Sequence, residues 1–225
     1  MKAAAEFLDV SKIYGRFAAL RKLSVTFAAG SCGVILGANG AGKSTLLRLT
    51  AGLAAPTRGE VKVFDTAPQQ QRGRVAYMSH ASMLYDELSA MENLRYFAAL
   101  TVGKGCDCAG SPEMALRAVG LDPALGRPVG EYSQGMRQRT SFARVLQSDP
   151  ELLLLDEPFS NMDAESVGQM VELLADFRTW PVSGGGSRTI LLTTHQVQLA
   201  MPLADHVVTL KHGEMVAAKV TEAVS

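Results

Sequence analysis

The loop Gly37-Ala38-Asn39-Gly40-Ala41-Gly42-Lys43-Ser44 dictates the architecture of this 225-residue chain. It has the pattern G-x-x-x-x-G-K-[ST], it follows the apolar residues 33–36, and a helical pattern begins near Lys43. A buried strand, a glycine-rich turn and a helix in this order direct successive backbone N–H groups at the phosphates of a nucleotide. We predict that Lys43 contacts the β and γ phosphates and that Ser44 holds Mg²⁺, with Thr45 beside it. An ordinary strand-to-helix turn is the alternative.

A second part of the same site is predicted where an apolar strand ends in two acidic residues. Residues 152–155 are four consecutive leucines, and Asp156 and Glu157 follow them. Such a run is typical of a strand that is buried on both faces. We expect Asp156 to bind Mg²⁺ and Glu157 to accept a proton from an attacking water. A solvated strand end would have the same pattern, and the phosphate loop favours the catalytic interpretation.

Composition and charge exclude several classes of protein. Apolar residues make up 47% of the chain and charged residues 20%, as in globular domains that bury a core. Lys plus Arg and Asp plus Glu are both 22, so no net basic field favours nucleic acid. Polar residues interrupt every apolar run before the roughly 20 residues that a spanning helix needs. We therefore expect no nucleic-acid partner and no membrane span.

The N-terminal segment and the cysteines predict a chain that stays in the cytoplasm. Glu6 and Asp9 interrupt the apolar segment that a signal peptide would need. The three cysteines, Cys32, Cys106 and Cys108, have no paired spacing. They therefore predict neither a disulfide framework nor a zinc site, and Cys106 and Cys108 are expected in a loop.

Short apolar runs alternate with stretches of helical periodicity, which is typical of the α/β class. Ser89 and Glu92 have the spacing of a capping box, so a helix is expected to begin there. The predicted strands are residues 6–10, 23–27, 33–36, 59–64, 75–78, 152–155 and 189–193, with a terminal hairpin of 207–210 and 215–218. The predicted helices start near 43 and cover 89–100, 114–119, 134–146 and 167–178, and residues 103–112 and 183–187 are predicted loops.

One segment separates the families that share a phosphate loop. Tyr132-Ser133-Gln134-Gly135-Met136-Arg137-Gln138-Arg139 resembles the signature of ABC-transporter ATPases, LSGGQ followed by a basic helix. Ser133 and Gly135 are kept, whereas Tyr132, Gln134 and Met136 depart from the consensus. The distances along the chain from Lys43 to Ser133 and from Ser133 to Asp156 are usual for that family. The resemblance extends over nearly all of the chain.

The resemblance implies a fold and a set of partners. The fold would be a P-loop NTPase of ABC ATPase type, with a RecA-like parallel-sheet core, an antiparallel β subdomain and a helical subdomain. Residues 1–225 would form one ABC ATPase domain, in which residues 81–149 are the mainly helical signature lobe and residues 1–80 and 150–225 are the rest. ATP and Mg²⁺ would bind between two copies in a head-to-tail homodimer.

The same resemblance assigns further residues. Tyr14 would stack on adenine, and Ser133 and Gly135 would face the γ phosphate that the other subunit holds. Asp163 lies in the place of the D-loop, Ser160-Asn161-Met162-Asp163, which aligns the subunits. His195 resembles the switch histidine that contacts the γ phosphate.

His80 points to a subfamily. Most ABC ATPases have Gln at this position, near Mg²⁺ and the attacking water. His80, together with residues 84–88 and 192–196, is similar to the ATP-binding subunit of the haem exporter of cytochrome c biogenesis. Another ABC exporter with an unspecialised substitution, or a soluble iron–sulfur assembly ATPase, remains the alternative.

This resemblance also implies separate transmembrane permease subunits and a peripheral location on the cytoplasmic face of the inner membrane. The permease would dock near residues 80–100. An apolar ridge is predicted there, formed by Leu84, Tyr85, Leu88 and Met91.

Overall fold

A computed structural model describes residues 2–101, 111–182 and 185–220. Three antiparallel strands form a small sheet in the order β2–β1–β4. They are β1 (Ala3–Tyr14), β2 (Phe17–Ala28) and β4 (Arg58–Val63). The predicted strands 6–10 and 23–27 were too short, because Asp9 and Lys22 have positive φ and the register shifts near them, which breaks the alternation of apolar residues.

A second sheet of six strands has the order β5–β6–β7–β3–β8–β9. The first five strands run parallel, and β8 and β9 form the predicted antiparallel hairpin. The carboxyl ends of the parallel strands meet at one edge, where α/β sheets bind ligands. The strands are β3 (Cys32–Leu36), β5 (Val75–Met78), β6 (Leu152–Asp156), β7 (Thr189–Thr194), β8 (His206–Lys211) and β9 (Glu214–Val220).

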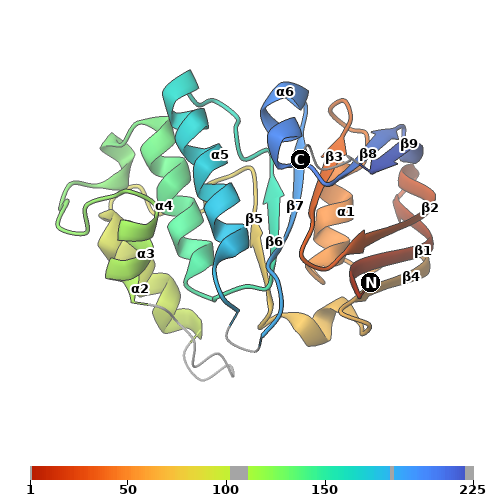
Figure 1. The fold of residues 1–225 in the computed structure, drawn as a ribbon, viewed down its shortest axis with the longest axis horizontal. Coiled ribbons are helices and arrows are strands. Elements are labelled where there is room, and N and C mark those ends of the chain that lie inside the picture. The colour runs from red at the N-terminus through yellow and green to blue at the C-terminus, as the bar shows by residue number, and fades with distance from the viewer. Residues whose placement is uncertain (1, 102–110, 183–184, 221–225) are drawn as a thin grey trace.

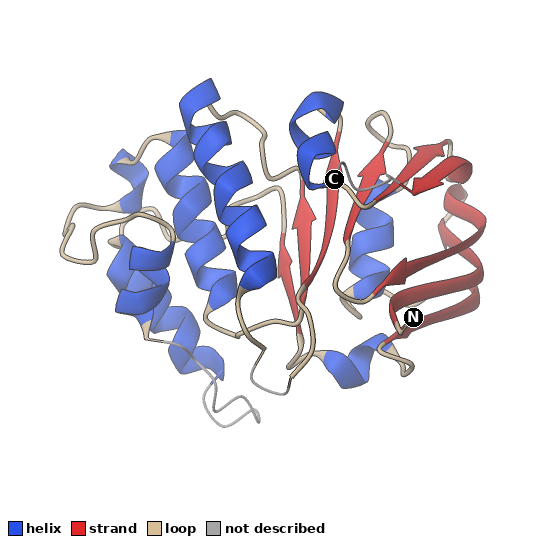
Figure 2. Cartoon of the chain, in the orientation of Figure 1, coloured by secondary structure: helices blue, strands red, loops and turns tan. Residues whose placement is uncertain are grey.

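Six α-helices are present in the described residues, and Figures 1 and 2 show that α2, α3 and α4 gather at the end of the molecule opposite the antiparallel strands. The capping box is confirmed, because the backbone N–H of Glu92 donates to Ser89 Oγ at 3.2 Å and that of Ser89 donates to Glu92 Oε2 at 2.8 Å. Two helices begin two or three residues earlier than predicted. The helices are α1 (Lys43–Thr50), α2 (Ala90–Thr101), α3 (Pro112–Ala118), α4 (Gln134–Leu146), α5 (Ala164–Thr179) and α6 (Val197–Ala200).

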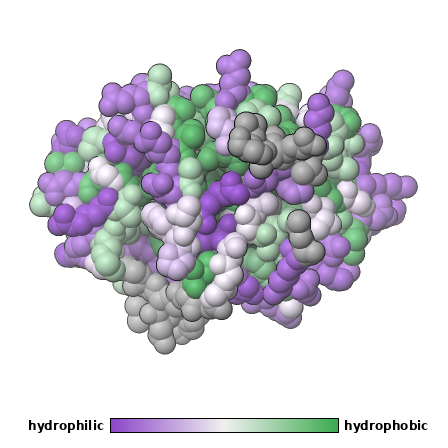
Figure 3. Space-filling model, in the orientation of Figure 1, coloured by the Kyte–Doolittle hydropathy of each residue, from purple (hydrophilic) through white to green (hydrophobic). Residues whose placement is uncertain are grey.

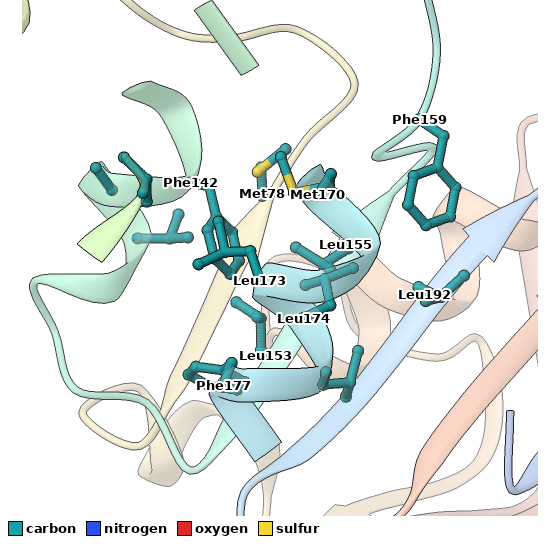
Figure 4. Close-up of a cluster of buried hydrophobic side chains, with 14 of the residues drawn as sticks. Met78, Phe142, Leu153, Leu155, Phe159, Met170, Leu173, Leu174, Phe177 and Leu192 are labelled. Atoms are coloured by element: carbon teal, nitrogen blue, oxygen red, sulfur yellow. The ribbon is translucent and has the colours of Figure 1, made fainter. Parts of the chain in front are cut away.

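The core lies on both faces of the parallel sheet. Leu153 and Leu155 pack into one hydrophobic cluster, whereas Leu152 and Leu154 pack into the other. Figure 4 shows the first cluster, where side chains of α5 lie against Leu153 and Leu155. Burial on both faces explains why the strand is apolar at every position. It also fixes the end of β6, where the acidic residues follow.

Cys32 is the cysteine that the structure describes, and it is buried. Burial raises the pKa of Cys32 to about 12, so its thiol stays protonated. The predicted loop positions of Cys106 and Cys108 lie outside the described residues. Hydrophilic residues are spread over the face drawn in Figure 3, with hydrophobic areas between them. None of the described helices has the length and apolar character needed to cross a bilayer.

Candidate nucleotide site

The phosphate loop connects β3 to α1, as predicted. Gly42 precedes α1 with φ of 107°, and a Cβ there would lie 2.5 Å from the carbonyl oxygen of Ala19. Only glycine tolerates both the left-handed backbone and this close approach. No side chain caps the first turn of α1, so its N–H groups remain donors for an anion.

Lys43 is buried in this loop, and its ammonium is held by oxygen atoms on several sides. Its Nζ donates to the carbonyl oxygen of Gly37 at 2.7 Å and to that of Ala38 at 3.3 Å. The same atom lies 3.2 Å from Glu157 Oε1. The cation therefore joins the phosphate loop to the acidic end of β6.

Asp156 is 4% exposed and accepts hydrogen bonds from three hydroxyl groups. Ser44 Oγ and Thr193 Oγ1 donate to Oδ1 at 3.0 and 2.7 Å, and the hydroxyl of Tyr77 donates to Oδ2 at 3.2 Å. Burial, and next the charge of Asp156, raise the pKa of Tyr77 to about 12. The sequence predicted Ser44 and Asp156 together; it did not predict Thr193 or Tyr77.

Glu157 follows in a left-handed backbone conformation, with φ of 52°. Its N–H is shared between the carbonyl oxygen and the Oγ1 of Thr193, both at 3.1 Å. Its Oε2 lies 3.0 Å from Nδ1 of His195, whose side chain is 55% exposed. The carboxylate thus lies between the ammonium of Lys43 and the imidazole of His195, which suits a residue that handles a proton next to the phosphates.

A cavity of about 960 Å³ unites most of the predicted site. It contains residues from the phosphate loop, the ends of β5, β6 and β7, and β2. The lining includes Phe17, Asn39, Gly40, Ala41, Gly42, Lys43, Ser44, Thr45, Tyr77, His80, Asp156, Glu157 and His195. A smaller cavity of about 310 Å³ shares His80 and Glu157 with it and continues toward Tyr132, Gln134 and Arg137. His80 therefore lies between the phosphate loop and the signature segment.

Tyr14 does not line the larger cavity. It ends β1 half-exposed, and Lys12 Nζ lies 4.8 Å from the centre of its ring. Its partner across the hairpin, Phe17, does line the cavity. Phe17 was missed by sequence reasoning, although its position directly opposite Tyr14 across a two-residue turn was a usable signal. The contact of Tyr14 with adenine stays a prediction.

Ser133, Gly135 and Asp163 lie outside the lining of the larger cavity. Ser133 caps α4 by accepting from the N–H of Met136 at 3.2 Å. Asp163 caps α5, and hydrogen bonds from the backbone and side chain of Ser166 lower the pKa of its carboxyl. A Cβ on Gly135 would lie 2.7 Å from the Cβ of Ser166, so α4 and α5 meet closely at this point.

The predicted apolar ridge is exposed at Tyr85, whereas its other three members are partly buried. Leu84 and Met91 pack against the core, and Leu88 is partly buried. The buried Asn93 ties this segment to α2, because its side chain exchanges hydrogen bonds of 2.8 and 3.0 Å with the backbone of Tyr85. Beside it, the exposed rings of Tyr85 and Tyr96 and the partly buried ring of Phe97 contact one another, mainly edge to face, and we call these three residues the aromatic patch.

The donor set around Asp156 fits Mg²⁺. The metal prefers oxygen ligands, keeps several waters, and is bound by one or two protein groups plus substrate phosphates. Ser44 Oγ and the carboxylate of Asp156 are 3.0 Å apart and supply such groups. Within the described residues no group of three or more His, Cys, Asp or Glu side chains gathers as a self-sufficient metal site would require.

Comparisons with known proteins show the family of the chain. A family model described as ABC transporter matches residues 20–160. A fluoroquinolones export ATP-binding protein of Mycobacterium tuberculosis is 36% identical over 203 residues, which are 88% of this chain and 64% of that protein. The ABC transporter ATP-binding protein NatA of Bacillus subtilis is 34% identical over 204 residues, 88% of this chain and 80% of its own. The chain thus spans less than two thirds of the Mycobacterium relative.

Solved structures show the same fold. The ATP-binding cassette MJ0796, in a dimeric post-hydrolysis state with ADP and Pi, aligns with a TM-score of 0.83 at 22% identity over 97% of this chain and 99% of its own. An ATP-binding subunit of an ABC transporter aligns with a TM-score of 0.77 at 26% identity, covering 96% and 90% of the two chains. A phosphate loop on this fold defines a nucleotide-binding protein. The chain belongs to the ABC transporter family.

Proposed function

We propose that the chain hydrolyses ATP to drive an exporter whose transmembrane permease is formed by separate subunits. The observation that carries this proposal is the position of Glu157, whose two oxygens lie 3.2 Å from Lys43 Nζ and 3.0 Å from His195 Nδ1. A carboxylate held between these groups, beside a phosphate loop, is a suitable general base for water.

The residues around the phosphates have separate tasks. Lys43 would exchange the loop carbonyls for the β and γ phosphates, and this movement frees one oxygen of Glu157 to accept the proton of water. His195 orients the other oxygen through Nδ1 and offers its second ring nitrogen to the substrate. Ser44 and Asp156 would hold Mg²⁺, which neutralises charge on the β and γ phosphate oxygens.

A homodimer completes the site in this proposal. Ser133 lies at the N-terminus of the 13-residue helix α4, where N–H groups and the helix dipole favour a phosphate. It does not line the cavity around its own phosphate loop. A second copy, placed head to tail, would bring its Ser133 and Gly135 to the γ phosphate and place Asp163 at the interface. MJ0796, which has the same fold, is described as dimeric, and this supports a dimer here.

The substrate proposal rests on His80. We infer that the permease is the haem exporter of cytochrome c biogenesis, because His80 lies in both cavities and resembles the residue of that subfamily. The relatives are named for other cargoes, namely fluoroquinolones, Nod factor and phosphonates. The chain would work at the cytoplasmic face of the inner membrane, and an exporter of another cargo is the second candidate.

The aromatic patch is the docking surface that we propose for the permease. Tyr85 and Tyr96 are 45% and 42% exposed, and their ring centres are 5.0 Å apart. Exposed aromatic rings of this kind are enriched where proteins dock. An iron–sulfur assembly ATPase would instead bind a soluble scaffold protein.

Two experiments test the proposed function. The first measures phosphate release from MgATP by the purified chain and by Lys43→Ala, which lacks the cation of the loop. We expect turnover in the parent and a loss of at least about 100-fold in the variant; equal rates would place the site elsewhere. The second identifies the protein that copurifies from detergent-solubilised membranes. A multi-span membrane protein supports export, and a soluble scaffold supports the iron–sulfur alternative.

A further inference from the structure

The carboxylate of Asp156 is buried and is held by hydroxyl groups rather than by cations. None of the ion pairs found among the described residues includes Asp156, which is 4% exposed. A buried carboxylate is costly unless hydrogen bonds or a metal compensate its charge. Here Ser44 and Thr193 donate to Oδ1 and Tyr77 donates to Oδ2. The three hydroxyls therefore define where the carboxylate points.

If the metal site is as proposed, the three hydroxyls would differ in whether they stay hydrogen-bonded to Asp156 when Mg²⁺ binds. Ser44 would leave Asp156 in order to bind Mg²⁺. Thr193 and Tyr77 come from β7 and β5, the two strands that flank β6 in the sheet. Thr193 is the direct register partner of Asp156, and its side chain is fully buried. Both hydroxyls are therefore carried by rigid elements and remain on Asp156 when Ser44 leaves.

The hydroxyl of Thr193 also accepts a hydrogen bond from Glu157. A hydroxyl has one donor and two acceptor positions. The hydroxyl of Thr193 donates to Asp156 Oδ1 at 2.7 Å, and its oxygen accepts a hydrogen bond from the backbone N–H of Glu157 at 3.1 Å. Because Glu157 has a positive φ of 52°, its backbone needs such support to stay in place. One side chain thus sets the positions of the proposed metal ligand and the proposed general base.

We propose that Thr193 and Tyr77 are positioning residues, which hold the carboxylate of Asp156 in the orientation that receives Mg²⁺ with ATP. This proposal rests on the proposed function. Hydrogen-bonding partners of metal ligands contribute about 10- to 100-fold to metal affinity. Thr193 has a second effect, on Glu157, which Tyr77 lacks.

The test measures Mn²⁺ binding by electron paramagnetic resonance, with a saturating non-hydrolysable ATP analogue and the intact chain. Tyr77→Phe and Thr193→Val each remove one hydroxyl. Thr193→Ser keeps the hydroxyl of this position and removes only the methyl group, and Ser31→Ala is the control. Ser31 is buried and donates to the carbonyl oxygen of Ala28, away from the cavity. We expect about tenfold weaker Mn²⁺ binding in Tyr77→Phe and in Thr193→Val, and parental binding in Thr193→Ser and Ser31→Ala.

A second measurement separates the two residues. At saturating Mg²⁺, Thr193→Val should still lower kcat, because Glu157 loses one hydrogen bond, whereas Tyr77→Phe should recover most of its rate. Parental Mn²⁺ affinity, within about twofold, in folded Tyr77→Phe and Thr193→Val would overturn the positioning roles and leave the proposed function intact. A parent that binds neither Mn²⁺ nor nucleotide would overturn the proposed function itself.

Discussion

At the scale of residues, the chemistry depends on what surrounds Glu157. The left-handed backbone at this position is uncommon for a non-glycine residue and costs free energy. It turns the carboxylate toward Lys43 and His195, at 3.2 and 3.0 Å. Such strain is tolerated where a side chain must reach a ligand, and the hydrogen bonds that the N–H of Glu157 donates to the two oxygens of Thr193 offset it.

Glu157→Gln tests the general base. The amide keeps the shape of the side chain but cannot accept a proton, so we expect MgATP affinity within about threefold of the parent. Turnover should fall by about 10²- to 10⁴-fold. Phosphate release and the fluorescence of a labelled ATP measure the two quantities separately. Parental turnover would assign the base to another residue.

His80→Gln tests the histidine in the two cavities. The side chain of His80 lies between the phosphate loop and the signature segment. A Gln amide also offers a donor and an acceptor at this position, so the variant should keep substantial ATPase activity and its coupling to the permease. Phosphate release, measured with and without the permease, checks both quantities. Retained hydrolysis together with lost coupling would place His80 in docking instead.

At the scale of elements, the segment before α2 connects the aromatic patch to the signature helix. Asp86 Oδ1 accepts from Arg137 of α4 at 2.6 Å, and the N–H groups of Val129 and Gly130 donate to Leu88 and Asp86. Force on Tyr85 would thus reach α4 through the next residue along the chain. In the proposed complex, this segment would connect a docked permease to α4.

Tyr85→Asp should separate docking from nucleotide binding. A charge in the aromatic patch opposes burial against an apolar partner, so the variant should be released from membranes that contain the permease. ATP affinity should stay parental. Val216→Asp is a matched control, because Val216 is 57% exposed on β9, outside the patch. Retention of Tyr85→Asp on membranes would move the docking surface elsewhere.

The capping box allows a test of stability. Ser89→Ala removes the hydroxyl that binds Glu92 and should lower the Tm by about 2–4 °C at neutral pH. Hydrogen bonds to Ser89 lower the pKa of Glu92 in the folded chain, so its stabilisation is present above the unfolded pKa and is lost as the pH falls through the folded pKa. The Tm difference should therefore shrink in acid. A difference that does not depend on pH would contradict this role of Glu92.

Residues 75–78 and 134–146 illustrate what the sequence could predict. Their apolar periodicity and the flanking signals are local, and the structure has β5 and α4 with these bounds. The roles of Thr193 and Tyr77 could not be predicted, because they depend on the strand order β5–β6–β7. The one local signal was Thr193 itself, a hydroxyl residue at the end of an apolar strand.

At the scale of the whole molecule, the proposed dimer would combine two parts of the chain that do not line the same cavity. The phosphate loop opens on the larger cavity, whereas Ser133, Gly135 and Asp163 lie outside its lining. Zero net charge leaves no strong repulsion between two copies. Bound ATP would add the attraction between a γ phosphate on one copy and the N-terminus of α4 on the other. Hydrolysis would remove it, and the dimer would open.

The most direct measurement is the mass of Glu157→Gln in light scattering, with and without saturating MgATP. The chain has a mass of 24.0 kDa. We predict a monomer without nucleotide and a species of twice that mass with MgATP, because the variant binds ATP without consuming it. Adding Ser133→Arg should prevent the dimer while ATP still binds, since the bulky side chain fills the space for the γ phosphate. A Glu157→Gln chain that stays monomeric at saturating MgATP would contradict the proposed head-to-tail homodimer.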